Sequence, residues 1–290
     1  QVGDKFYEAD ALHLLATSIN DFQKAKEYYE AAFRIQEDIG DRNGIGWSLT
    51  QLARSNYVEH CFDIADDYSV RARAIQRERH DWKGLHYSLI NYATWAFLRG
   101  KGADAVAAAE ESLEVAITMR MLTPERASRA TLGLILVATE TDVERGQDLC
   151  LKVLSTFLPL VSSITEAEFD AFNGLAIAAY LRADMIALCD YHQQVSLHVG
   201  TTWITQNKYN LLVNLATSGI LVLDAQNHTA LAVELTALVV QIPDLAGLPA
   251  IAWLEKWPLL NRLRSRWQVK LGAEAFADAW ERGKTRDLDQ

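Results

Sequence analysis

The chain has 290 residues, half of them hydrophobic, and a formal net charge of −10. This composition is typical of a folded protein of one or two domains. Because nucleic-acid binding depends on clustered Lys and Arg side chains, the acidic balance argues against direct binding of DNA or RNA. No segment approaches the roughly 18 uninterrupted apolar residues of a membrane-spanning helix, so no membrane partner is expected.

The three cysteines, Cys61, Cys150 and Cys189, lie far apart and form no CxxC pair. An odd, scattered set predicts neither a disulfide framework nor a zinc site, and it favours a reducing, cytoplasmic setting. The chain has no basic-then-apolar leader, and it begins at Gln1 without an initiator Met. We interpret it as a fragment of a longer polypeptide.

Helix-type periodicity covers the first half of the chain, which contains no proline before Pro124. Apolar residues recur there at spacings of three and four, and the alternation typical of strands is missing. One such run is Ala25, Tyr28, Tyr29, Ala32, Phe33 and Ile35. The pattern predicts an all-α protein.

A repeat with a period of 40 residues organises this pattern. Residues 44–53 (GIGWSLTQLA) overlay on residues 84–93 (GLHYSLINYA), and the same apolar and small pair recurs at 132–133, 175–176 and 215–216. A second amphipathic stretch begins near Ala25, Ala65 and Ala105, again 40 residues apart. Fixed self-similarity of this length is the signature of a helical repeat array.

Each unit therefore reads as two antiparallel helices, with turns at Gly40–Asp41 and Gly100–Lys101. Small side chains at the recurring position allow helix axes to approach, so that neighbouring hairpins bury a shared seam. We predict a right-handed superhelical, tetratricopeptide-like solenoid of about six helix pairs over residues 1–242, closed by capping helices over 243–290. The period alone does not separate this class from HEAT repeats.

Two segments carry a family resemblance. Residues 40–53 (GDRNGIGWSLTQLA) resemble the "GDRRGIAWSLNNLA" units of tetratricopeptide arrays in bacterial STAND signal-transduction ATPases, a group that includes LuxR-type and SARP-type transcription regulators. Residues 271–283 (LGAEAFADAWERG) resemble the "LGEEAFAAAWAEGR" closing helix of that group. The resemblance implies a cytoplasmic sensor arm that holds a nucleotide-binding core inactive until a signal arrives. The chain lacks a GxxxxGK[ST] phosphate loop, so any such core would belong to another part of the polypeptide.

A stripe of aromatic and amide residues is the candidate binding site, because the first helix of each pair lines the concave face of such arrays. Aromatic residues stand one helical turn before amides in two units, and related positions occur in the first and last units. Amides beside rings suit a peptide, a protein surface or a small polar inducer. The alternative is that the rings pack between units and the amides cap turns, and Thr131 and Gly174 interrupt the stripe. The predicted site consists of Tyr7, Trp47, Gln51, Tyr87, Asn91, Asn210 and Asn214.

Other candidates are weaker. Cys189 and His192 share a helix face, but His198 is out of register with them, so a structural role is favoured over a metal site. The acidic run Glu110, Glu111 and Glu114 has the pattern of a solvated helix face. No catalytic motif is present, and no catalytic residue, metal or cofactor is expected.

Arg262, Arg264, Arg266 and Lys270 form a basic cluster among apolar residues, which favours a capping helix over a docking surface. The sequence thus predicts a non-catalytic sensor or protein-interaction domain. The alternatives are a scaffold for self-association or for docking on the ATPase core, and an all-helical enzyme.

Overall fold

The computed structural model describes residues 2–19, 21–155, 166–199, 208–246, 254 and 257–286. This part of the chain forms fourteen helices and no strand, which confirms the all-α prediction. The helices are α1 (Val2–Ser18), α2 (Phe22–Ile39), α3 (Arg42–Val58), α4 (Phe62–Glu78), α5 (Trp82–Leu98), α6 (Gly102–Thr118), α7 (Leu122–Ala138), α8 (Val143–Ser155), α9 (Glu166–Leu181), α10 (Met185–Val199), α11 (Lys208–Ala225), α12 (Thr229–Ala246), α14 (Pro258–Leu271) and α15 (Ala273–Thr285).

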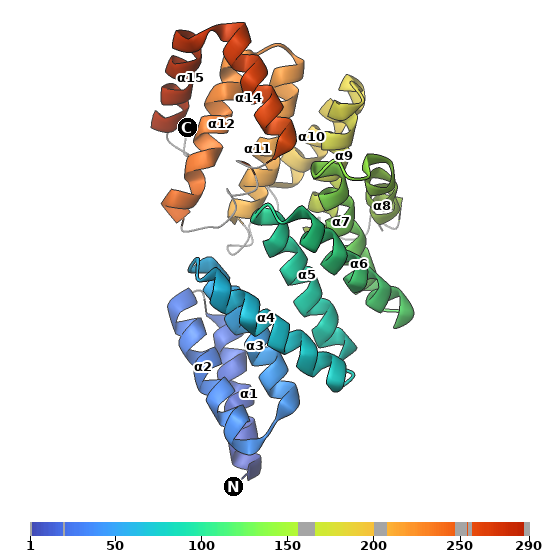
Figure 1. The fold of residues 1–290 in the computed structure, drawn as a ribbon, viewed down its shortest axis with the longest axis vertical. Helices are drawn as coiled ribbons and strands as arrows, with labels where there is room; N and C mark the ends of the chain where they lie inside the picture. The colour runs from blue at the N-terminus through green and yellow to red at the C-terminus, as the bar shows by residue number, and fades with distance from the viewer. Residues whose placement is uncertain are drawn as a thin grey trace.

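The helices stack as hairpins in chain order, from α1 near the N-terminus to α15 at the other end of the array (Figure 1). Each helix from α1 to α12 packs against the next one along the chain, and the odd-numbered helices from α3 to α11 also contact each other in succession. Helices α14 and α15 pack against α12. The solenoid of antiparallel helix pairs is therefore confirmed. None of the described helices combines the length and apolar character needed to cross a bilayer.

A module of one helix and one short turn produces the 40-residue period. Helices α3 to α7 have 17 residues each and are joined by turns at 59–61, 79–81, 99–101 and 119–121. The central residues of these turns, His60, His80, Gly100 and Arg120, adopt left-handed φ angles between +53° and +72°. One 17-residue helix and one three-residue turn follow each other with the same geometry throughout, so two helices and two turns make one 40-residue repeat.

Each of these turns closes with the same two backbone hydrogen bonds. In the turn after α4, the His80 N–H donates to the Arg77 carbonyl (3.2 Å) and the Asp81 N–H to the Gln76 carbonyl (2.9 Å). This pair of bonds satisfies carbonyls that the helix end would otherwise leave unpaired. Asp81 then caps α5 by accepting from the Gly84 N–H at 2.9 Å.

Buried hydroxyls lie 40 residues apart along the seam between hairpins. Ser48 donates to the Gln36 side chain (2.7 Å), and Ser88 donates to the Gln76 side chain (2.7 Å). Gln76 also donates to Thr50 at 3.2 Å, so that α4 is bonded to both α3 and α5. All five of these residues are buried. The seam between the first three hairpins therefore contains a satisfied polar layer.

Glycines lie in the seam in the middle of the array. A Cβ atom on Gly133 would lie 2.6 Å from the Cys150 sulfur and 2.9 Å from the Gly146 carbonyl oxygen. A Cβ atom on Gly174 would lie 2.8 Å from the same sulfur and 3.3 Å from the Leu134 Cα. Helices α7, α8 and α9 therefore pack closely because these positions have no side chain.

The apolar core also differs between the N-terminal and C-terminal parts of the array. Helices α1 to α4 contain two small, separate clusters of buried residues, one around Tyr29 and Leu52 and one around Leu49 and Ile75. From Leu85 onward, one large cluster continues through to α15, and two smaller clusters lie beside it, one around Cys150 and one around Phe169.

The basic cluster of α14 binds the solenoid itself. Arg262 pairs with Glu140 at 2.7 Å, beyond the end of α7, and Arg266 donates to the Tyr180 hydroxyl (2.9 Å) near the end of α9. Arg266 also pairs with Asp224, near the end of α11. These contacts place α14 across the ends of three successive odd-numbered helices, as expected for a capping helix.

Candidate functional site

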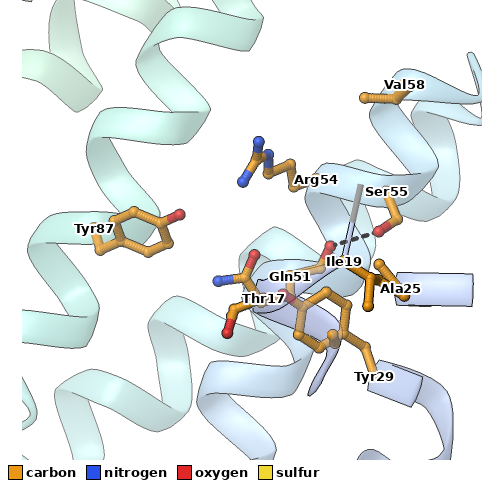
Figure 2. Close-up of a pocket in the computed structure, with 10 residues that line it drawn as sticks. Thr17, Ile19, Ala25, Tyr29, Gln51, Arg54, Ser55, Val58 and Tyr87 are labelled. Carbon is orange, nitrogen blue, oxygen red and sulfur yellow. Dashed lines mark hydrogen bonds between the residues drawn. The ribbon is translucent and has the colours of Figure 1, made fainter. Parts of the chain in front are cut away.

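A solvent-open pocket lies between the first hairpin and helices α3 and α5, and its cavity volume is about 120 Å³. Two residues of the predicted stripe line it, Gln51 from α3 and Tyr87 from α5. Figure 2 shows Tyr87 on one side of the opening, Gln51 and Tyr29 on the other, and the Arg54 guanidinium directed between them.

The polar groups of this pocket have few partners within the protein. The Gln51 side chain is 7% exposed, and its amide makes no hydrogen bond to any described residue. The Ser55 hydroxyl donates to the backbone carbonyl of Gln51 (3.1 Å), not to its side chain. Arg54 is half-buried, and no carboxylate of the described residues lies within ion-pair distance of it. An amide and a cation that line an open pocket without internal partners can both bind a ligand.

Two phenols complete the polar lining. Burial raises the pKa of Tyr29, Arg54 opposes this shift and Tyr87 adds to it. Tyr29 is therefore protonated at neutral pH and has an O–H to donate. The ring of His13 packs edge-on against Tyr29, with ring centroids 5.1 Å apart. Burial lowers the pKa of His13 and Asp10 opposes that shift, so this imidazole is neutral at pH 7.

Part of the pocket lining is apolar. This part is formed by Ala16 of α1, Ile19 before α2, Ala25 of α2 and Val58 of α3. The site therefore combines an apolar part with polar groups contributed by α2, α3 and α5, the arrangement typical of small-molecule and side-chain binding pockets.

The structure places the predicted stripe only partly in one site. Trp47 stacks on Tyr87 with ring centroids 5.8 Å apart and an interplanar angle of 30°. The ring of Trp47 therefore packs between two units, as the alternative hypothesis held, while Gln51 faces the pocket. On α5, the Asn91 side-chain nitrogen is buried and has no hydrogen-bond partner among the described residues.

The remaining stripe residues lie elsewhere. Tyr7 is 73% exposed on α1 and does not line the pocket. Asn210 and Asn214 belong to α11, but their side chains lie outside the part of the chain that the structure describes. At the two interrupting positions, Thr131 donates to Asp170 (3.4 Å) and Gly174 packs against Cys150.

Sequence reasoning missed Arg54 and Tyr29 as binding residues. Arg54 follows Gln51 by three positions and so shares its helix face, which was a usable signal. Tyr29 was identified only as part of a helical pattern. Its role depends on the approach of α2 to α3 and α5, which periodicity does not reveal.

The metal and acid–base candidates have structural partners. His192 Nδ1 lies 2.8 Å from the Ser218 hydroxyl, and no potential metal-binding group of His, Cys, Asp and Glu occurs among the described residues. The side chain of His198 lies outside them. Glu110 pairs with Arg145 (2.6 Å), and Glu111 pairs with Arg77 (2.5 Å), consistent with a solvated helix face.

Comparison with known proteins adds no family assignment. No protein-family model matches the chain, and no curated protein has a significantly similar sequence.

Proposed function

We propose that the chain is a non-catalytic sensor or protein-interaction domain that binds a peptide, a protein segment or a small inducer on the inner face of α1, α3 and α5. The observation that supports this proposal most directly is Gln51, a residue that is 7% exposed overall and whose side-chain amide faces the pocket without a hydrogen-bond partner among the described residues. A ligand that pairs this amide gains a hydrogen bond worth about 1 kcal/mol.

A second amide without a partner lies one repeat beyond the pocket. Asn91 on α5 occupies the position equivalent to Gln51 one repeat later, and its buried side-chain nitrogen also lacks a partner among the described residues. A side-chain amide can donate to and accept from a peptide backbone. Two such amides on successive repeats suit an extended partner that crosses α3 and α5.

The chemistry of the pocket supports binding over catalysis. Among the described residues that line it, Ser55 is one hydroxyl-bearing candidate nucleophile, but its hydroxyl donates to a backbone carbonyl. The imidazole nearest to the pocket, His13, contacts the Tyr29 ring rather than a hydroxyl. The chain has no nucleotide-binding loop, so in the regulator that the resemblance implies, ligand binding here would be relayed to a separate nucleotide-binding core.

A binding screen tests this function. The whole chain is presented with a peptide array and a metabolite collection, and the hits are titrated against Gln51→Leu and against Val70→Ala, a control on α4 where Val70 is 57% exposed. We expect hits whose affinity falls about tenfold in Gln51→Leu, because one buried hydrogen bond is lost, and stays unchanged in Val70→Ala. Hits that are insensitive to Gln51→Leu would count against the inner face as the binding site.

The scaffold alternative has one observation in its favour. Helix α1 exposes four large apolar side chains, which is unusual for a helix without a partner. These residues are Phe6, Tyr7, Leu14 and Leu15. If this surface mediates self-association, light scattering will give a dimer mass that reverts to the monomer mass in Tyr7→Ser/Leu14→Ser. Docking on a nucleotide-binding core would be measured by mixing the two parts.

A further inference from the structure

We propose that the pocket between α1, α2, α3 and α5 takes a single carboxylate carried on an apolar or aromatic body, held by Arg54 with Gln51 and Tyr29. This inference rests on the proposed binding function and names the chemical class of the ligand.

The first step concerns charge. Neighbouring arginines of the array are paired across helices, as in Arg99–Asp66 (2.8 Å) and Arg42–Glu78 (2.7 Å). Arg54 is half-buried and has no such partner among the described residues, although the chain as a whole carries a net charge of −10. Desolvating a guanidinium without a counterion is unfavourable, and its planar fork matches the two oxygens of a carboxylate. An anion is therefore the missing partner.

The second step concerns the number of charges. Arg54 is the only cationic side chain among the described residues that line the pocket. One guanidinium balances one negative charge, whereas a phosphate dianion would keep an unpaired charge in a partly buried site. The pocket therefore favours a monoanion.

The third step concerns the neutral donors. The Gln51 amide and the phenolic O–H of Tyr29 line the same space as the guanidinium and can donate to the carboxylate oxygens that Arg54 leaves free. Tyr87 closes the opposite side (Figure 2).

The fourth step concerns the rest of the ligand. Ala16, Ile19, Ala25 and Val58 form the apolar part of the lining, and Tyr29 and Tyr87 also line the pocket. The cavity volume of about 120 Å³ admits only a small group. A short alkyl chain or one aromatic ring packed against these residues would exclude water from the ion pair.

A carboxylate of this kind can come from a free small acid or from a Glu side chain in a hydrophobic peptide. The experiment therefore has two arms, both read by calorimetric titration of the whole chain. In one arm the probes are phenylacetate and hexanoate, each compared with its neutral amide. In the other, an end-blocked Leu-Phe-Glu-Phe-Leu peptide is compared with the peptide that carries Gln in place of Glu.

In at least one arm, we expect the acid to bind saturably and at least tenfold more tightly than its amide. Arg54→Gln should abolish this preference, and Arg54→Lys should retain a part of it. Arg71→Gln is the matched control, since Arg71 lies on α4 and forms an exposed ion pair with Asp67 (3.5 Å). Thermal unfolding checks that all variants are folded.

Two outcomes would overturn the inference. One is equal affinity for acid and amide in both arms, or no binding in either. The other is an acid preference that survives Arg54→Gln in a folded protein. If the screening hits still depend on Gln51 in either case, the proposed binding function stands and only the ligand class is wrong. If neither dependence is found, both proposals fail.

Discussion

The seam between α2 and α5 and the seam between α7 and α9 are formed by the same helix-and-turn module, but different residues lie in them. Between α2 and α5 the seam contains hydroxyls and amides such as Gln76, Ser88 and Thr50, all hydrogen-bonded to one another. Between α7 and α9 the seam contains Gly133 and Gly174, packed directly on Cys150. Helices α7 and α9 accordingly share a long interface, whereas α3 and α5 touch over a short stretch.

One stripe position shows what this difference means for function. The residue is Gln51 in α3, Asn91 in α5, Thr131 in α7 and Gly174 in α9. From α3 to α9 the side chain at this position becomes smaller, and α7 and α9 share a longer interface than α3 and α5. We call α1 to α5, which contain the pocket, the open half of the array, and α7 to α15 the closed half.

The largest expected effect concerns the contact that fixes α14 to the closed half. Asp224 accepts from the buried Trp267 indole N–H (2.6 Å) and from Tyr180 and Arg266. Asp224→Ala leaves these donors unpaired and should lower the free energy of unfolding by about 4 kcal/mol. Urea unfolding followed by circular dichroism measures this. A loss below about 1 kcal/mol would show that α14 does not lock the array.

The same carboxylate gives the closed half a pH dependence. Burial would raise the pKa of Asp224, but hydrogen bonds from Trp267, Tyr180 and Arg266 outweigh it and hold the pKa below its ordinary 3.8. A lowered folded-state pKa adds stability that is complete above the unfolded-state pKa and is lost as the pH falls through the folded value. Unfolding at pH 6 and pH 3 should show a steeper loss for the wild type than for Asp224→Asn. Equal losses would contradict this assignment.

The second effect tests the glycine seam. Gly133→Ala places a Cβ where the Cys150 sulfur and the Gly146 carbonyl already lie, at 2.6 and 2.9 Å. Since one of these atoms is backbone, we expect a loss of about 3 kcal/mol by urea unfolding. Gly46→Ala is the control, because its Cβ would meet its nearest neighbours at 3.4 Å. That substitution should change the stability by no more than about 1 kcal/mol. Similar losses of stability for both variants would mean that the seam between α7 and α9 does not depend on glycine more than the seam of the first hairpins does.

The third effect tests the polar seam of the open half. Gln76→Leu removes the partner of Ser88 and Thr50, both buried, and should cost about 2 kcal/mol. Replacing all three, as Gln76→Leu/Ser88→Ala/Thr50→Val, removes the unpaired groups as well. The triple variant should therefore recover most of the loss. A triple variant less stable than the single one would contradict this. The three polar side chains would then stabilise the fold beyond pairing one another's hydrogen-bonding groups.

The smallest effect concerns the turns that both halves share. Ala183 adopts a left-handed φ of +57°, whereas Gly100 occupies the equivalent position after α5. Ala183→Gly should raise the free energy of unfolding by about 1 kcal/mol, because glycine adopts a positive φ without strain. Gly100→Ala should lower it by a similar amount. Differential scanning calorimetry on the two variants measures this. Changes of the same sign in both would mean that backbone strain does not set the stability of these turns.

Much of the fold could be predicted from the sequence, because the 40-residue period is local information repeated many times. The turns at Gly40 and Gly100 were visible as glycines. The equivalent turns at His60, His80 and Arg120 were not, because tertiary packing imposes a left-handed conformation there on residues that rarely adopt it.

The site was predictable only in part. Gln51 and Tyr87 stood out because their positions recur, while Arg54 and Tyr29 gain their role from the approach of α2 to α3 and α5. Ser48 and Ser88 were visible in the repeat overlay, but Gln36 and Gln76, which bond to them, lie on the preceding helices. A periodic pattern shows which residues share a face, and it does not show which polar groups are left without partners.

Hydrogen exchange measured by mass spectrometry, with and without a saturating concentration of whichever acid probe binds in the titrations, tests most directly whether the open half is the binding half. The account predicts that amides of α1 to α4 exchange faster than those of α7 and α9 in the free protein. The bound acid should then add protection in α1, α2, α3 and α5 and leave α7 and α9 unchanged. Protection that appears in α7 to α12, or in no part of the array, would contradict it.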